Sequence, residues 1–478
     1  MSDGVGKRVR KNTGLMLGAK GVGAVMAAAG IVFAVQGLSV EEFGLLVYMH
    51  AYILFFTEVA TFDSWLVMVR HAAGGLTGDE AAKSDPERIG RVARFCSSLD
   101  LLSASAGFAV AILIAVVASQ FVEVIAQATP FLFFYCLLIF LNQKSASLGV
   151  LRLFDRFDLV ALNSLTIPFT RMAGCGLAWA FGAPFWVYVA VWFVGSAVSY
   201  LTLPVLAYFE LKRRKLWSAV KAGRLTLTAP EPKVWRFVMY TNIDTAIAAG
   251  AAQLPLLLAG NIGGAAYAGI FRIAQEVAIV LAKGAVMIDR VVYPEFTNLI
   301  AKGEGARVPG LVLRTGGAMF AVGAVIGAIV WVGGPSALAW ALGPEYVKAA
   351  GLAVLLILGA SLTAASGPLF PAFYASGKPK KAIFARLSGL SVMVIGFFAL
   401  YHTVGRIGPG FAVMTGALVT LLVAVYIARL HDWSASTGAA QGQDALSVSR
   451  TSEGETSAVD DRTGGPGQPG SSSGRSSE

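Results

Sequence analysis

Charged residues are scarce in this sequence of 478 residues. Only 14% of the residues are Asp, Glu, Lys or Arg, whereas 56% are hydrophobic and the mean hydropathy is +0.67. Soluble domains carry about 25% charged residues, so an ordinary water-soluble enzyme is excluded. The apolar residues gather in blocks of about 20 or more, the length that crosses roughly 30 Å of hydrocarbon as a helix. We therefore predict a polytopic, all-α membrane protein.

Cysteine is rare, and the common metal and nucleotide motifs are missing. The three cysteines, Cys96, Cys136 and Cys175, lie in or beside apolar segments, where a free thiol serves as a small hydrophobe. The sequence has no GxxxxGK[ST] loop, no HExxH motif and no Cys/His cluster. We therefore expect no disulfide framework, no ATP hydrolysis by this chain, no metal and no cofactor.

Hydropathy predicts twelve membrane spans, with ends uncertain by a few residues. The spans are expected at 13–38, 44–69, 96–121, 125–150, 158–182, 186–209, 237–260, 264–288, 310–333, 350–374, 384–404 and 408–429. Nearly all Lys and Arg of the connections lie in alternate loops, and the opposite loops hold only Lys348 and Arg406. Because an excess of Lys and Arg marks the cytoplasmic side, both termini are expected in the cytoplasm. This distribution argues against nucleic acid as the partner of a chain with net charge +10.

The longest basic connection divides the spans into six and six. We therefore expect an N-terminal six-helix lobe at residues 1–209, a basic cytoplasmic linker at 210–236 and a C-terminal six-helix lobe at 237–430. Residues 431–478 are rich in Ser, Gly, Thr and charge and have few large apolar residues. Such a segment cannot bury enough surface to fold, so we expect a disordered tail.

Charged residues inside spans are candidate functional groups, because each is costly in lipid and normally faces protein or water. One face of the eighth span carries four of them within about 40° of one another. They are Arg272, Glu276, Lys283 and Arg290. The stripe indicates a helix that lines an aqueous cavity or a buried polar seam. The alternative is an Arg272–Glu276 pair that locks two helices together, with Lys283 reaching the interface.

Other spans add charges of both signs. Arg171 in the fifth span and Glu58 in the second lie nearest to mid-membrane, and Asp244 in the seventh is intermediate. Lys20 in the first span and Lys144 in the fourth are close enough to an interface to snorkel.

Three further polar residues and two prolines have simpler interpretations. We expect Asp63 and Asp100 at hydrated span ends, and His50 as a hydrogen-bonded core residue rather than a proton carrier. Pro168 and Pro368 are expected to interrupt the fifth and tenth spans. These kinks serve either packing or a hinge.

Bases and acids together favour a secondary transporter over a channel. Lys and Arg in a cavity suit an anionic cargo such as phosphate or pyrophosphate, and acids suit a coupling proton or cation, H⁺ or Na⁺. The candidate substrate-binding residues are Arg272, Lys283, Arg171 and Lys20. The candidate ion-coupling residues are Glu276, Glu58 and Asp244.

Five short motifs resemble a known family over roughly residues 7–430. They are NTGL at 12–15, LSVEEFG at 38–44, LRLFDRF at 151–157, LGPEY at 342–346 and ASGKP at 375–379. With the six-plus-six arrangement, they are similar to the polysaccharide flippases of the multidrug/oligosaccharidyl-lipid/polysaccharide exporter superfamily. Their motifs are degenerate and point to the superfamily better than to one substrate.

The resemblance implies two six-helix lobes around a central cationic cavity in a bacterial inner membrane. It implies a cargo of undecaprenyl-pyrophosphate-linked oligosaccharide for cell-surface polysaccharide synthesis, such as lipopolysaccharide or exopolysaccharide. Bilayer lipids and polysaccharide assembly proteins would be further partners. Related flippases place a functional base in the first helix and another in the eighth, where this chain has Lys20 and Arg272.

Two other function classes stay open. A cation-coupled multidrug antiporter of the same superfamily would share the fold, although its cavity should favour acids over bases. A membrane polysaccharide polymerase or glycosyltransferase would be an enzyme and usually needs a sizeable outer loop, whereas every outer loop expected here is short. The sequence therefore favours a flippase that is not an enzyme.

Overall fold

The computed structural model describes residues 2–74, 76–231, 234–301, 308–367, 369–370, 373 and 379–430. All regular structure in these residues is helical. The expected tail at 431–478 lies outside the described residues.

The N-terminal helices run up to Lys221, and the last of them lies within the expected linker at 210–236. They are α1 (Ser2–Gly37), α2 (Val40–Ala60), α3 (Ser64–His71), α4 (Gly78–Ala82), α5 (Pro86–Ala118), α6 (Glu123–Tyr135), α7 (Leu137–Leu141), α8 (Ser145–Leu153), α9 (Phe157–Ser164), α10 (Thr166–Ala180), α11 (Phe185–Arg213) and α12 (Trp217–Lys221).

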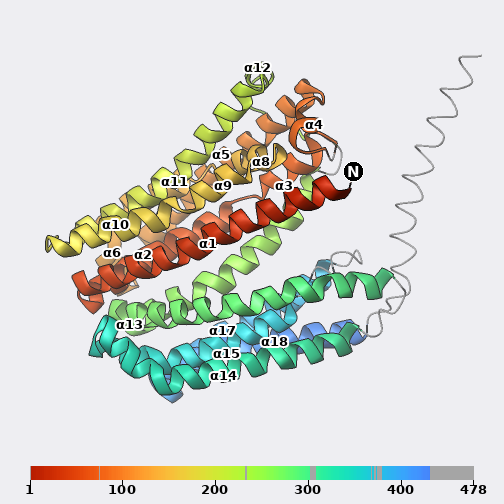
Figure 1. Ribbon diagram of the computed structural model, residues 1–478. Helices are drawn as coiled ribbons and strands as arrows, with labels where there is room; N and C mark the ends of the chain where they lie inside the picture. The colour runs from red at the N-terminus through yellow and green to blue at the C-terminus, as the bar shows by residue number, and fades with distance from the viewer. Residues whose placement is uncertain are drawn as a thin grey trace, which may run out of the picture.

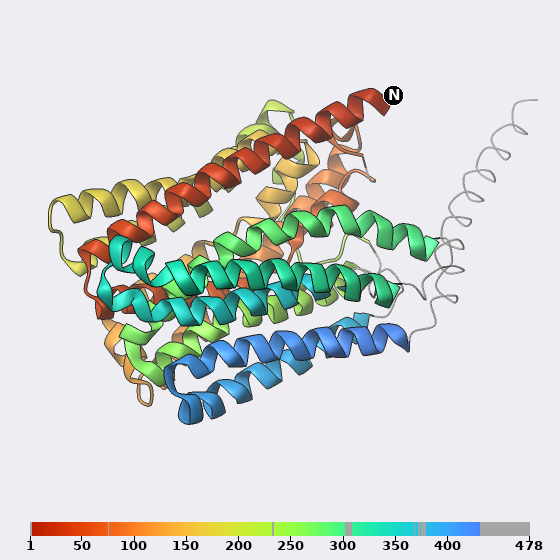
Figure 2. The ribbon, with the colours of Figure 1, turned by 60° about the horizontal axis from the view of Figure 1, so that its bottom comes forward.

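The remaining helices follow the linker. They are α13 (Val234–Ala301), α14 (Val308–Leu342), α15 (Ala349–Ser366), α17 (Pro379–Val404) and α18 (Gly408–Arg429), with short 3-10 turns at Pro344–Lys348 and Gly405–Ile407. In Figure 1 the helices up to α12 lie above α14 to α18. Figure 2 shows the same two groups from another direction. The long helix α13 joins them, because it packs against α2 on one side and against α15 and α17 on the other.

Nine segments of the described residues are long and apolar enough to cross a membrane. Four of the nine contain a break between helical stretches, among them Val40–His71, which holds α2 and α3, and Glu123–Leu153, which holds α6, α7 and α8. Thr245–Ile279 is interrupted at Gly264, where φ is 81° and ψ is 177°, and Lys380–Arg429 contains both α17 and α18. The segment expected at 158–182 is divided into α9 and α10, which are both short. The arrangement of twelve spans in two lobes stays a prediction.

Local sequence explains how the second helix begins. Ser39 is the N-cap of α2, and its hydroxyl accepts the Glu42 backbone N–H at 3.2 Å. The Glu42 carboxylate accepts the Ser39 N–H at 2.9 Å, which completes a capping box. Glu41 and Glu42 also place negative charge at the positive end of the helix. These contacts start α2 three residues after the end of α1.

Two helices of the N-terminal half are broken at facing points. One break separates α2 from α3 at 61–63, and the other separates α7 from α8 at 142–144. Asp100 of α5 joins them, since one carboxylate oxygen accepts the Ser64 hydroxyl at 2.6 Å and the other accepts the Ala146 N–H at 2.7 Å. The side chain of Asn142 also donates to the Thr61 hydroxyl at 3.0 Å. The two breaks are thereby held together inside the protein, and the Ala146 N–H at the start of α8 is satisfied.

The environment of Asp100 corrects one expectation. This residue was expected at a hydrated span end, but only 4% of it is exposed. Its burial is possible because both carboxylate oxygens accept hydrogen bonds from the starts of α3 and α8. Asp63 is half-buried and accepts the Thr245 hydroxyl of α13 at 2.7 Å. Both residues therefore hold helices together.

The interpretations of cysteine and proline agree with the structure. The three cysteines are free and buried. The fifth expected span is interrupted between Ser164 and Thr166, one turn before Pro168, as expected from the backbone bond that proline removes. The helix α15 ends at Ser366, two residues before Pro368.

The linker is attached to the N-terminal half by an ion-pair network. Glu231 accepts hydrogen bonds from His71 at 2.7 Å and from Arg88 at 2.6 Å. Partial burial opposes the ionisation of Glu231, but the hydrogen bonds and charges of His71 and Arg88 outweigh it and lower its pKa below the ordinary value of 4.5. The network therefore requires the ionised carboxylate.

This network predicts a loss of stability in acid. A carboxylate whose pKa is lowered by folding contributes stability above its unfolded pKa, and this is lost as the pH falls through its folded pKa. Melting temperatures measured in detergent below pH 4.5 should fall less steeply for Glu231→Gln than for the wild type. The exposed Glu87 provides a control, because Glu87→Gln should keep the wild-type slope. Equal slopes for all three proteins would contradict the prediction.

Candidate functional site

Charged and aromatic side chains from both groups of helices converge around His50 of α2. The imidazole is 93% buried, with a residual exposure of 7%. Its Nε2 atom lies 2.9 Å from Nη2 of Arg171 on α10, and its Nδ1 atom lies 3.2 Å from the hydroxyl of Tyr135 on α6. The ring of Trp192 on α11 packs edge-on at 5.1 Å between centroids. We name this group, together with Arg272, the His50 cluster.

The hydrogen bonds assign the tautomer of His50. Arginine is always protonated and can only donate, so Nε2 of His50 accepts from Arg171. The imidazole proton then lies on Nδ1 and is directed at Tyr135. His50 is therefore a hydrogen-bonded core residue, which confirms the sequence-based interpretation. Its contact with Arg171 was not expected from the sequence.

Arg171 is held in position by its neighbours. Its guanidinium lies over the Trp192 ring, 4.0 Å from the ring centroid, as a cation–π contact. The Nε atom is buried and has no hydrogen-bond partner among the described residues. A buried donor without a partner is costly. The cation is thus fixed in place with one buried donor left unpaired.

Arg272 of α13 brings a second positive charge to the same place. Its charge acts on both His50 and Arg171. It forms a salt bridge with Glu276, one turn further along α13. The pair lies within one helix, so it does not tie two helices together, and its side chains keep exposures of 20% and 26%. The i,i+4 pair is therefore present without locking two helices together, and its side chains are partly exposed.

A second charged group lies further along α2. Glu58 lies near Lys144 and near Gln253 of α13, and both side chains interact with its carboxyl group. The Lys144 ammonium lies 4.4 Å from the centre of the Tyr200 ring on α11. The phenol of Tyr200 interacts with the charges of both Glu58 and Arg171. Tyr200 therefore links this second group to the His50 cluster.

The remaining predicted residues are not part of the cluster as described. Lys20 is exposed on α1. The side chains of Asp244 and Lys283 lie outside the described residues, so their roles stay predictions. No group of three or more His, Cys, Asp or Glu within the described part of the chain is placed to hold a metal ion.

Sequence reasoning missed His50, Lys144, Tyr200 and Trp192 as members of one site. The residues of the contact between Arg171 and His50 are 121 positions apart, so no local spacing could reveal it. The only available signal was a polar residue in an apolar span, which is also common in ordinary helix packing. The arrangement provides two guanidinium groups from different helix groups, a neutral imidazole and two carboxylates.

Comparison with known proteins identifies the fold. No protein-family model matches the chain. It is 26% identical over 348 residues to the inner membrane protein YghQ of Escherichia coli (strain K12), covering 73% of this chain and 96% of that protein.

Two solved structures share most of the architecture. An inward-facing multidrug resistance MATE family transporter of the MOP superfamily matches with a TM-score of 0.61 and 14% identity, over 86% of this chain and 95% of that chain. The lipid II flippase MurJ in an inward closed conformation matches with a TM-score of 0.59 and 14% identity, over 88% of this chain and 90% of that chain. The chain therefore has the fold of these transporters.

Proposed function

We propose that this protein is a flippase that moves an undecaprenyl-pyrophosphate-linked oligosaccharide across the bacterial inner membrane by alternating access. It would supply cell-surface polysaccharide synthesis and would not act as an enzyme. One observation carries the proposal: the Arg171 guanidinium of α10 donates to the buried His50 imidazole, and the charge of Arg272 of α13 acts on both of these groups. Two such cations between two groups of helices suit a diphosphate, which carries several negative charges.

The location of the two cations supports transport rather than static binding. Substrate sites of secondary transporters lie near mid-membrane where two halves meet. Arg171 belongs to the helices before the linker and Arg272 to those after it. A pyrophosphate held between them would therefore bridge parts that move relative to one another. Of the two solved structures compared above, one is described as a multidrug resistance transporter and the other as a lipid II flippase.

The carboxylates supply the return step of the proposed cycle. Glu276 neutralises Arg272 in the structure, and Glu58 lies near Lys144. A bound diphosphate would compete with Glu276 for Arg272. The displaced carboxylate could then take up H⁺ or Na⁺, which links cargo binding to the coupling ion. We place both termini in the cytoplasm on the basis of the basic loops.

Removal of Arg272 tests this proposal. A charge-assisted hydrogen bond contributes about 1.5–3 kcal/mol, so Arg272→Ala should lower export of surface polysaccharide by about tenfold or more. Export would be measured in cells that lack the chromosomal copy, at equal amounts of protein in the membrane. The exposed linker residue Arg224 gives the matched control, because Arg224→Ala removes the same charge outside the site. Undiminished export by Arg272→Ala would exclude Arg272 from the cargo site.

A second candidate function is a cation-coupled multidrug antiporter. The match with a multidrug resistance transporter and the partly exposed Glu276 favour it. In that case the purified protein should bind a cationic dye, and Glu276→Gln should abolish binding. A flippase with an anionic cargo should show no dye binding that depends on Glu276.

A further inference from the structure

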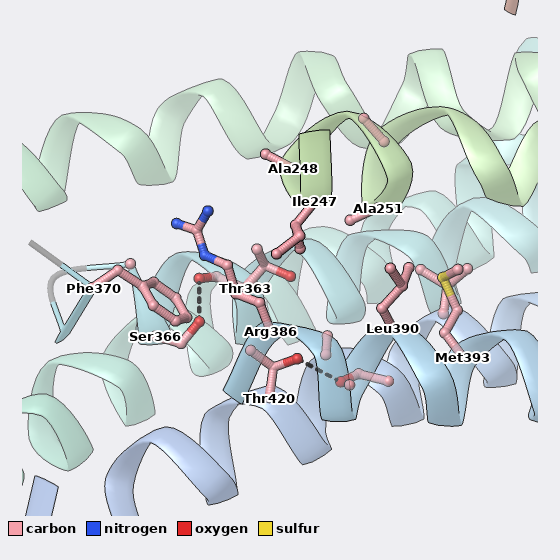
Figure 3. A pocket seen from close by; sticks show the side chains of 16 residues that line it. Ile247, Ala248, Ala251, Thr363, Ser366, Phe370, Arg386, Leu390, Met393 and Thr420 are labelled. Carbon is pink, nitrogen blue, oxygen red and sulfur yellow. Dashed lines mark hydrogen bonds between the residues drawn. The ribbon is translucent and has the colours of Figure 1, made fainter. Parts of the chain in front are cut away.

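A cavity of about 390 Å³ lies among the helices that follow the linker, apart from the His50 cluster. Its walls come from α13, α15, α17 and α18 and the short stretch around Phe370. The volume falls in the range of small-molecule and cofactor sites. Figure 3 shows Arg386 and Phe370 near one end of the cavity and Leu390 and Met393 towards the other. The cavity therefore has a charged end and an apolar end.

The lining offers almost no hydrogen-bond donors. Its three hydroxyls each donate to a carbonyl of their own helix: Thr363 to Gly359 at 3.0 Å, Ser366 to Thr363 at 2.9 Å and Thr420 to Gly416 at 3.0 Å. Most other lining side chains are Ala, Gly, Ile, Leu, Val, Met or Phe. Among the described lining side chains, only Arg386 carries a charge. A sugar, which needs many polar partners, would leave its hydroxyls unsatisfied here.

Arg386 defines the polar part of the ligand. Its guanidinium lies 4.2 Å from the centre of the Phe370 ring, which orients the planar group at the end of the cavity. A guanidinium in this position favours a phosphate by charge-assisted hydrogen bonds. The small residues Ala248, Ala251 and Gly416 leave room for a hydrocarbon chain beside it. The site thus fits an amphiphile with one anionic phosphate and an apolar chain.

We propose that this cavity binds an anionic phospholipid of the surrounding bilayer, with its phosphate at Arg386 and part of one acyl chain against α13 and α17. All lining residues follow the linker, so the site lies within one group of helices. A transported cargo would need contacts with both groups, whereas a resident lipid does not. The inference therefore does not depend on the proposed flippase activity.

Lipid binding to the purified full-length protein tests this inference. Native mass spectrometry would compare dioleoyl-phosphatidylglycerol with dioleoyl-phosphatidylcholine, which differ in net headgroup charge and share their chains. We expect the wild type to bind phosphatidylglycerol more tightly, and Arg386→Gln to weaken that binding by about tenfold or more. Arg429→Gln, an exposed change of equal charge on α18, should leave it unchanged.

A second variant tests the apolar part of the site. Ala251→Phe fills the cavity without changing its charge, and it should also weaken binding of phosphatidylglycerol. Unchanged affinity in both Arg386→Gln and Ala251→Phe would overturn the proposal. So would equal binding of the two lipids by the wild type, or binding of undecaprenyl phosphate but not of phosphatidylglycerol. Because no step measures export, a failed flippase proposal would leave this result unaffected.

Discussion

Glu210→Ala should lower the free energy of unfolding by about 3 kcal/mol or more. The Glu210 side chain is only 2% exposed and lies near the end of α11. Its carboxylate accepts hydrogen bonds from Arg156 at 2.6 Å, Arg213 at 2.7 Å and Arg214 at 2.7 Å. Removing one partner of a buried ion pair costs about 3–5 kcal/mol, because the remaining charges stay uncompensated. Arg213 is 61% exposed and regains water, so the loss should lie towards the lower end of that range.

Unfolding in denaturant, followed by loss of helix in detergent, would measure this effect. Asp79 offers a matched control, since its carboxylate pairs with Arg214 at 3.0 Å but is 90% exposed. Asp79→Ala should therefore change stability by less than about 0.5 kcal/mol. Glu210→Gln keeps an acceptor oxygen and should fall between the two. Equal denaturant midpoints for Glu210→Ala and Asp79→Ala would show that the burial of Glu210 does not increase the stability contributed by this network.

The parts of the fold that the sequence predicts well depend on neighbouring residues. The expected span at 186–209 lies within α11, because a long apolar block and a basic end are local signals. The Arg272–Glu276 pair was predictable for the same reason, since residues four apart share a helix face. Regular helices, and contacts within one helix, can therefore be predicted from composition and residue spacing alone.

The breaks in α2 and α7 could not be predicted in this way. Each break is stabilised by Asp100, through hydrogen bonds to residues 36 and 46 positions away. A continuous apolar block gives no sign that its backbone will be satisfied by a distant carboxylate. The same limit applies to the His50 cluster, where Arg171 of α10 contacts His50 of α2, and α13, which carries Arg272, packs against α2. A charged residue inside a span therefore identified a candidate functional residue. Only tertiary packing determines which of these residues contact one another.

The close contact of α2 and α13 carries the second large prediction. Gly44 of α2 faces the backbone of α13, and a Cβ atom added there would overlap the carbonyl group of Ala265. Gly269 completes the contact, with its own added Cβ only 3.0 Å from the Val40 carbonyl oxygen. Small residues let membrane helices approach this closely. A carbonyl of the backbone cannot turn aside as a flexible side chain can, so the helices would have to separate.

Gly44→Ala should therefore destabilise the protein by about 3 kcal/mol, at the upper end of the cost of overpacking. The direction of the change in stability is informative, because Gly→Ala inside a helix usually adds about 1 kcal/mol of stability. Gly327→Ala in α14 is the matched control, since its Cβ would meet only a Val354 methyl group at 3.5 Å, an ordinary contact. Denaturant unfolding should move in opposite directions for the two variants. A gain of stability in Gly44→Ala would mean that α2 and α13 lie further apart than the structure places them.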